Sequence, residues 1–202
     1  MTVSLMKDQP PMDVALIALG ANLPSHAGTP AQTLAAALAQ LDHGLVRVAA
    51  VSCFYETPCF PVGAGPDYVN AAAVLHSALS ADALLARLHE IEAEFGRARL
   101  TRWGMRTLDL DLLAFGAQVL PDRAAQVAWM ELPADAQRLR APNQLVLPHP
   151  RLQDRAFVLV PLADVAADWV HPITQRSVAH MLAALDPADV AQVRAIPRPP
   201  TL

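Results

Sequence analysis

The chain has 202 residues, 53% of them hydrophobic, and a formal net charge of −4 from 15 basic and 19 acidic residues. This length suits one domain with a sizeable core, and the apolar content excludes a disordered chain. The negative balance argues against a nucleic-acid-binding protein, because such proteins carry a basic surface.

The first half of the chain alternates predicted strands and helices. Residues 14–20 are an apolar run ended by Gly20 and predict a strand, and Thr29 and Pro30 supply a start signal for a helix over 29–42. The β-branched and aromatic residues of 45–57 predict the next strand. A loop is expected at 58–67, which holds three prolines and two glycines.

A strand over 68–77, a helix from Ser80 to Gly96 and a strand over about 107–115 complete this half. The order β-α-β-β-α-β is that of an α+β, ferredoxin-like sandwich, in which an antiparallel sheet carries two helices on one face. We expect the other face to be free for a functional site.

The second half is less regular. Residues 121–144 show no clear period and indicate a loop or an insertion, while 145–155 are rich in proline and extended. Residues 156–169 and 177–185 predict extra C-terminal helices. We expect one domain over 13–196, with disordered ends at 1–12 and 197–202.

The N-terminus has no long apolar stretch of the signal-peptide kind, and the apolar run 14–19 is too short to cross a membrane. We therefore expect a cytoplasmic protein without a membrane partner.

Two aspartates stand inside the apolar run LDLDLLAF (108–115). Residues two apart in a strand point to the same side, so Asp109 and Asp111 share a face. Two carboxylates about 6 Å apart repel by roughly 3 kcal/mol at an effective dielectric constant of ~20. Water or arginine partners could offset this repulsion, and so could Mg²⁺ held together with substrate phosphates.

Four arginines, and no acidic residue, lie between positions 97 and 106, just before the aspartate pair. Arginine binds phosphate through a planar fork, so cationic side chains beside paired carboxylates favour a polyphosphate bridged by Mg²⁺. A salt-bridged surface loop is the alternative. The chain has no P-loop and no GxGxxG or GxSxG motif.

Four blocks of the sequence resemble the family of 6-hydroxymethyl-7,8-dihydropterin pyrophosphokinases, enzymes of folate biosynthesis. The blocks are ALGANL (18–23), FYETP with PDYVNAA (54–72), GRAR with RWGMRTLDLDLL (96–113) and LPHPRLQDRAFVLVPL (147–162). The resemblance implies a ferredoxin-like enzyme that transfers the β,γ-pyrophosphoryl group of ATP to the hydroxymethyl group of the pterin and releases AMP. It also implies two Mg²⁺ ions. We further expect a monomer without a nucleic-acid partner.

The same resemblance assigns roles to individual residues. Asp109 and Asp111 would hold both metal ions, and Arg97 and Arg106 would be catalytic. The residues that match the pterin pocket are Thr57, Pro58, Phe60, Tyr68, Asn70, Trp103 and Phe157. Those that match the ATP site are His89, Arg99, Trp103, Arg106, Leu112, His149 and Arg155. Arg99 and Trp103 match a mobile loop that closes over the substrates.

The sequence departs from the family in three places. Cys59 and Phe60 stand where Pro and Leu are usual, and Gln144, Val146 and Pro150 replace polar residues around His149. Residues 121–144 resemble an insertion of about twenty residues beside the nucleotide end.

Two other classes of function compete with this interpretation. A glycosyltransferase could use the two aspartates to hold a metal and a nucleotide sugar, but it would need a larger nucleotide domain. An RNA-binding module could use the arginines, but its sheet should display stacking aromatic residues and no carboxylates.

Overall fold

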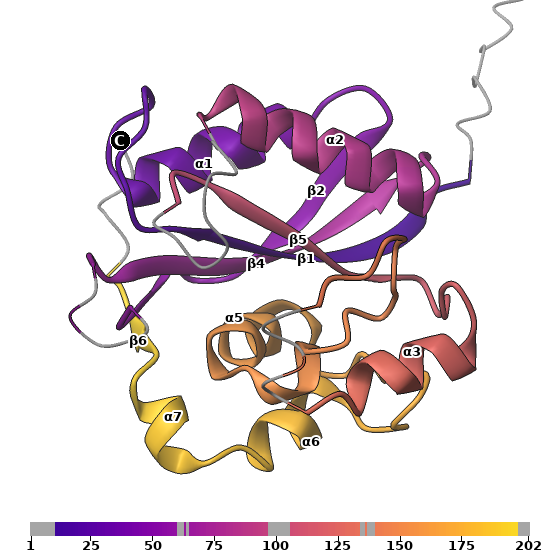
Figure 1. The fold of residues 1–202 in the computed structure, drawn as a ribbon. Helices are drawn as coiled ribbons and strands as arrows, with labels where there is room; N and C mark the ends of the chain where they lie inside the picture. The colour runs from indigo at the N-terminus through magenta and orange to yellow at the C-terminus, as the bar shows by residue number, and fades with distance from the viewer. Residues whose placement is uncertain are drawn as a thin grey trace, which may run out of the picture.

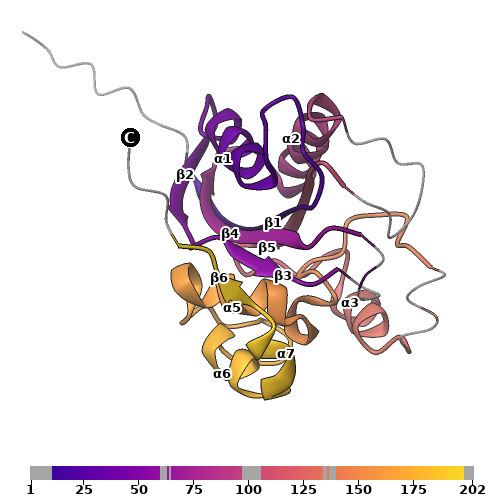
Figure 2. The ribbon, with the colours of Figure 1, turned by 90° about the vertical axis from the view of Figure 1, so that its left-hand side faces the viewer.

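The computed structural model describes residues 11–59, 63, 65–96, 106–133, 136 and 140–197. Within these residues an antiparallel sheet of six strands lies between two layers of helices, as Figures 1 and 2 show. The strands run in the order β5-β1-β4-β3-β6, and β2 also pairs with β4. They are β1 (Asp13–Ala21), β2 (Val46–Val51), β3 (Tyr55–Thr57), β4 (Tyr68–Ser77), β5 (Asp109–Phe115) and β6 (Arg194–Ala195).

One face of the sheet is covered by α1 (Pro30–Leu41) and α2 (Ala81–Glu94), as predicted. Both helices begin where the sequence signals them. The hydroxyl of Thr29 accepts a hydrogen bond from the backbone of α1 and that of Ser80 from the backbone of α2, which satisfies a free N–H group in each first turn. Their apolar stripes, which include Leu34 and Leu88, are fully buried against the sheet.

The predicted strand 45–57 is divided into β2 and β3, and both parts pair with β4. Between them, the Ser52 hydroxyl accepts from the Ala72 N–H at 2.9 Å. The Cys53 N–H then turns away from the sheet and donates to the Asp164 carboxylate at 3.0 Å. The break therefore connects the sheet to the helix that carries Asp164.

The second face of the sheet is not free, so that expectation was wrong. The helix α5 (Ala156–Ala166) lies across it, and α6 (Val178–Ala183) packs against α5. They form a second core in which Leu159, Leu162 and Met181 pack against sheet residues such as Leu16 and Ala72. Burial of each large apolar side chain is worth about 1.5–3 kcal/mol, so this layer contributes substantially to stability. Any site on this face must lie where the helices leave the sheet uncovered.

Several short elements have no counterpart in the sequence-based prediction. They are α3 (Arg123–Met130), η1 (Leu152–Asp154), α7 (Pro187–Ala191) and β6. The first lies inside the segment 121–144, which we expected to lack regular structure. Only Gln126 is fully buried in it, and Val127, Trp129 and Met130 are half-buried. With eight residues it is shorter than the window of about 11–18 residues over which a helical period can be recognised in a sequence. None of the helices in the described part of the chain has the length and apolar character needed to cross a membrane.

Candidate active site

The two aspartates lie on β5, on the face of the sheet that α5 covers, and both side chains are half-buried. Leu108, Leu110 and Leu112 pack in the core beneath α1 and α2, on the opposite face. In the pairing of β5 with β1, Gly20 lies opposite Asp109 and Ala18 lies opposite Asp111. Residues with little or no side chain therefore leave open space beside both carboxylates.

The charge of this pair is partly offset by arginines. The Arg106 guanidinium donates a hydrogen bond to the Asp109 carboxylate, and both side chains are mostly buried. The alternative in which each aspartate pairs with an arginine thus holds for Asp109. Burial lowers the pKa of the Arg155 guanidinium. The negative charge of Asp111 opposes this effect, but it is the smaller of the two.

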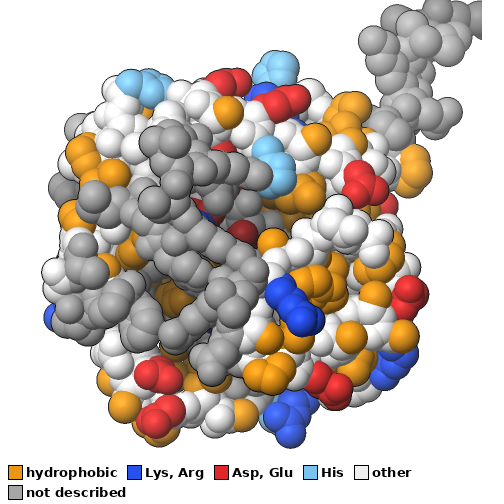
Figure 3. Space-filling view, viewed as in Figure 1, with side chains coloured by type: hydrophobic (Ala, Val, Ile, Leu, Met, Phe, Trp, Pro, Cys, Tyr) orange, Lys and Arg blue, Asp and Glu red, His pale blue; other side chains and the backbone are white. Residues whose placement is uncertain are grey.

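Both carboxylates line one small pocket together with Asn70, Phe157, Gly20, Ala18 and Leu19. The residues that line the pocket come from β1, β4, β5 and the first turn of α5. On the face shown in Figure 3, acidic side chains are visible in a recess near the centre. Carboxylates, an amide and an aromatic ring from three separate elements therefore meet in one place.

Asn70 is buried and its amide is held in one orientation. Its Nδ2 donates to the Thr57 hydroxyl at 2.7 Å across the β3–β4 pair. A methyl group at Gly20 would lie 3.1 Å from the Asn70 Oδ1, so glycine leaves that oxygen room. The amide oxygen is thereby available to a hydrogen-bond donor in the pocket, and burial makes such a bond selective.

Phe157 is 40% exposed although it belongs to the first turn of a well-packed helix. Its ring lines the pocket, and the Arg155 guanidinium lies 5.6 Å from the ring centroid. An exposed aromatic face at the edge of a polar pocket is suited to stacking against a flat heterocycle.

His149 lies beside β5, because its N–H donates to the Leu113 carbonyl at 2.8 Å. Burial, followed by the charge of Arg155, lowers the pKa of its imidazole to about 3, so the ring is neutral at physiological pH. The ring Nδ1 accepts from the Arg151 N–H at 3.1 Å, so Nε2 carries the hydrogen of the neutral ring. His149 can therefore offer a neutral donor to a ligand.

The other predicted residues are placed less closely together. Tyr68 pairs with Thr57 at the start of β4, and Pro58 follows β3. The side chain of Leu112 is part of the core, on the opposite face of β5 from the carboxylates, and so does not line the pocket. His89 is exposed on α2, in the helical layer on that opposite face. The predicted residues Phe60, Arg97, Arg99 and Trp103 lie outside the described residues.

Asn22 belongs to the site region, and sequence reasoning gave it no role. It is buried just beyond β1, where its Oδ1 accepts from the Arg106 N–H at 2.8 Å and its Nδ2 donates to the Pro66 carbonyl at 3.1 Å. The amide thus ties the arginine segment to the loop before β4. The sequence block ALGANL (18–23) does contain a signal for Asn22. A polar asparagine that directly follows a buried strand needs hydrogen-bond partners.

Cys59, which departs from the family pattern, helps to close the loop between β3 and β4. Its thiol lies 3.0 Å from the Gly65 carbonyl, and its N–H donates to the Asp67 carboxylate at 3.4 Å. Thr57 and Tyr68 therefore remain paired at the base of the loop although the usual proline is absent.

The donor set of the site suits a hard cation that is also bound by its substrate. Mg²⁺ takes oxygen ligands and usually binds one or two carboxylates plus phosphates and water. Two carboxylates on one strand face meet this need, and no group of three or more His, Cys, Asp or Glu side chains occurs among the described residues. The protein would thus supply only a few of the metal ligands, and the substrate would supply others.

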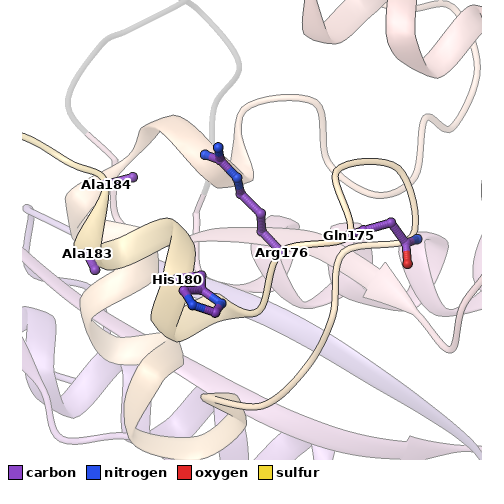
Figure 4. A pocket seen from close by; sticks show the side chains of 5 residues that line it. All are labelled: Gln175, Arg176, His180, Ala183 and Ala184. Atoms are coloured by element: carbon purple, nitrogen blue, oxygen red, sulfur yellow. The ribbon is translucent and has the colours of Figure 1, made fainter.

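A second, shallower hollow lies on the C-terminal helices, as Figure 4 shows. It is lined by Gln175, Arg176, His180, Ala183 and Ala184, and includes none of the predicted site residues. We therefore place the active site at the carboxylate pocket.

Comparison with known proteins shows the family to which the chain belongs. The family model for 7,8-dihydro-6-hydroxymethylpterin-pyrophosphokinase (HPPK) matches residues 16–167. A Synechocystis 2-amino-4-hydroxy-6-hydroxymethyldihydropteridine pyrophosphokinase is 36% identical over 85% of this chain and 76% of its own length. The enzyme of that name from Haemophilus influenzae is 37% identical over 81% of this chain and 88% of its own.

Among solved structures, a Plasmodium falciparum HPPK-DHPS shares the fold, with a TM-score of 0.60 and 13% identity. The match covers 87% of this chain and 44% of that one, so this chain spans less than half the length of that protein. The agreement of the family model, the relatives and the fold leads to one conclusion: the chain belongs to the HPPK family.

Proposed function

We propose that this chain carries out the reaction for which its family is named, in folate biosynthesis. It would transfer the pyrophosphoryl group of ATP to 6-hydroxymethyl-7,8-dihydropterin, giving AMP and the pterin pyrophosphate. The observation that carries the proposal is the single pocket in which two carboxylates, an oriented amide and an exposed aromatic ring meet.

The pterin would lie against Phe157, with its polar edge toward Asn70. A pterin is flat and carries both donors and acceptors on that edge, so it requires a stacking face and an amide of fixed orientation. The bond from Asn70 to Thr57 supplies that orientation. Pro58, Phe60, Tyr68 and Trp103 complete the proposed pterin site.

The nucleotide would lie on the side of His149 and Arg155. A neutral imidazole that offers its Nε2–H and a half-buried guanidinium are suitable groups for phosphate oxygens, since Arg binds them through a planar fork. His89, Arg99, Trp103, Arg106 and Leu112 belong to the same proposal, Leu112 only through its backbone, because its side chain is in the core.

In the proposed reaction the hydroxymethyl oxygen attacks the β-phosphorus of ATP. A new O–P bond forms and the hydroxyl proton passes to water. The bond from the β-phosphorus to the oxygen that bridges it to the α-phosphorus breaks, and AMP leaves with that oxygen. Arg97 and Arg106 would stabilise the negative charge spread over the transferred group, which lowers the barrier if they bind the transition state more tightly.

Asp109 and Asp111 would hold the two Mg²⁺ ions that enter with ATP. Bound metal would supply positive charge to neutralise the phosphates. Gly20 and Ala18 leave room for these ions opposite the two carboxylates.

The proposal describes a single domain over residues 13–196 that acts as a monomer in the cytoplasm. The continuous sheet, which joins β1 near the start of this range to β6 near its end, supports one structural unit. The segment 121–144 contributes α3 to it.

Two substitutions with opposite expected effects on the two substrates test where each substrate binds. Phe157→Leu should raise KM for the pterin about tenfold, because the stacking face is lost, and should raise KM for ATP by less, although the ring also contacts Arg155. Arg155→Gln should do the reverse. Equal effects on both constants in either variant would contradict the placement. Val170→Leu, at an exposed apolar position remote from the pocket residues in sequence, should change neither constant.

A further inference from the structure

The most deeply buried side chain of the helix α3 is polar. Of its eight residues only Gln126 is buried, with no exposed area. An isolated helix of this length is not stable in water, so α3 depends on its contacts. Asp122 caps its start by accepting from the Ala125 N–H at 2.9 Å, and Gln126 faces the protein.

The contact of Gln126 is with the backbone that leads into His149. Its Nε2 donates to the Pro148 carbonyl at 3.2 Å in a buried hydrogen bond. Its Oε1 is also buried and has no hydrogen-bond partner within the described part of the chain. A buried amide that is only half satisfied is costly, and an apolar side chain of the same length would fill the space without that cost. The distinctive contribution of glutamine here is therefore its bond to Pro148.

The neighbouring residues are fixed from two sides. Leu147 exchanges both backbone hydrogen bonds with Leu120, at 2.9 and 3.1 Å, just before the start of α3. On the other side, the His149 N–H donates to the Leu113 carbonyl of β5 at 2.8 Å. Pro148 lies between these two anchors, and Gln126 supplies the side-chain bond that holds its carbonyl.

We propose that α3 is a positioning element for the nucleotide, in which Gln126 holds the Pro148 carbonyl and thereby fixes the direction in which His149 offers its Nε2–H. This inference rests on the proposed function, in which His149 contacts ATP. Gln126 is a positioning residue, since it acts through Pro148 and His149. It should therefore affect ATP binding and not pterin binding, because Asn70 and Phe157 belong to other elements.

The first test removes the hydrogen bond but keeps the length of the side chain. Gln126→Met should raise KM for ATP about fivefold, the loss expected for one hydrogen bond. KM for the pterin and kcat should stay within twofold of the wild-type values. Unchanged KM for ATP, or an equal rise in both KM values, would overturn the proposal.

Gln175→Met is the matched control. Gln175, which Figure 4 shows beside the hollow on the C-terminal helices, also donates its amide to a proline carbonyl, that of Pro172 at 2.8 Å. The control therefore removes the same kind of bond away from the pocket, and neither KM should change. A rise in KM for ATP in the control would show that general loosening produces the effect.

The second test uses the wild-type protein and so does not depend on whether a variant folds. Coupling between two sites is reciprocal, so if α3 positions His149 for ATP, bound ATP must stabilise α3. Hydrogen exchange at the amides of Gln126 and Glu131, which donate to Asp122 and Val127, should slow severalfold with Mg²⁺ and ATP. The pterin alone should not slow it.

The outcomes of this second test separate the two claims. If ATP protects residues 147–155 but not α3, the proposed function stands and the positioning role of Gln126 is wrong. If ATP protects neither segment, the nucleotide site itself is wrong and the inference fails with it.

Discussion

At the scale of single residues, the site is a balance of charges around β5. Arg106 bonds Asp109 in the structure, and the charge of Asp111 acts on Arg155, so the carboxylates are not left without cations. The proposed reaction requires Arg106 to exchange this carboxylate for a phosphate when ATP and Mg²⁺ bind. Arg106 would then bind the Asp109 carboxylate in the absence of ligands and a phosphate of ATP in their presence. This exchange would connect metal binding to phosphate binding.

Asp111→Ala tests the metal role more directly than Asp109→Ala, because Asp109 also bonds Arg106. We expect turnover to fall at least about a hundredfold, a loss of roughly 3 kcal/mol in transition-state stabilisation. The melting temperature without ligands should stay within a few degrees, because a repulsion is removed. Asp168→Ala, at an exposed position, is the control. Near wild-type turnover that still depends on Mg²⁺ would show that Asp111 does not hold the metal.

Arg106→Lys keeps the positive charge and removes the planar fork. We expect at least a tenfold loss of turnover, or about 1.4 kcal/mol, because one ammonium group cannot make the two-pronged contact with phosphate. Arg47→Lys, on β2, should be neutral. If Arg106→Lys were nearly as active as wild type and less stable, Arg106 would be a structural partner of Asp109 and no more.

At the scale of elements, local signals in the sequence were sufficient where a strand or helix depends on its own residues. Thr29 and Ser80 begin the two helices as predicted, and β4 has the predicted bounds 68–77. The sharing of one face by Asp109 and Asp111 also follows from strand geometry alone.

The remaining features depend on residues far apart in the chain. The division of 45–57 into two strands depends on Asp164, which is 111 residues from Cys53. The role of Asn22 depends on Arg106, which is 84 residues away. Periodicity within one segment cannot indicate such contacts, and α3, with eight residues, is too short for its helical period to be recognised in the sequence.

The contact of Asp164 with the sheet gives a prediction about α5. Its carboxylate accepts from the Cys53 N–H and from the Tyr55 hydroxyl at 2.8 Å. Burial, followed by the bond to Asp164, raises the pKa of Tyr55 to about 12, so the phenol remains a donor at neutral pH. Tyr55→Phe should lower the free energy of unfolding by about 1 kcal/mol, and Asp164→Ala by about 1–3 kcal/mol, as measured by urea denaturation.

The double variant checks whether these losses arise from one contact. Its loss should be smaller than the sum of the single losses, because each substitution removes the same Tyr55–Asp164 bond. Additive losses would mean that the hydroxyl and the carboxylate act independently.

At the scale of the whole molecule, one sheet serves two cores, and the pocket lies at the end where the second core stops. In the proposed function the C-terminal helices are part of the catalytic scaffold, since α5 would supply Phe157 and packs through Leu159 and Leu162. Destabilisation of the C-terminal helical layer should therefore also disturb the proposed pterin site, because it would displace Phe157.

The stability of that layer should depend on pH through His171. This residue is fully buried between α5 and α6, and burial lowers the pKa of its imidazole to about 4. Its Nδ1 accepts from the Ile173 N–H at 3.1 Å, which requires the neutral ring. Below the ordinary pKa of 6.5 the unfolded chain binds a proton that the folded chain does not, so stability should fall as pH drops from 6.5 toward 4 and should be level above 6.5.

Thermal melts between pH 4 and pH 8 test this dependence. His171→Asn, whose Oδ1 can replace the accepting nitrogen, should melt lower at pH 7 but lose less stability as the pH falls. A pH dependence identical to that of wild type would show that other groups cause the acid sensitivity.

The central claim is that this chain transfers a pyrophosphoryl group as one unit, and product analysis tests it most directly. Purified protein with ATP, Mg²⁺ and 6-hydroxymethyl-7,8-dihydropterin should be followed by ³¹P NMR. AMP and the pterin pyrophosphate should appear in equal amounts, with no product unless both substrates are present. ADP with a pterin monophosphate, or no pterin-dependent consumption of ATP by folded protein, would contradict the central claim.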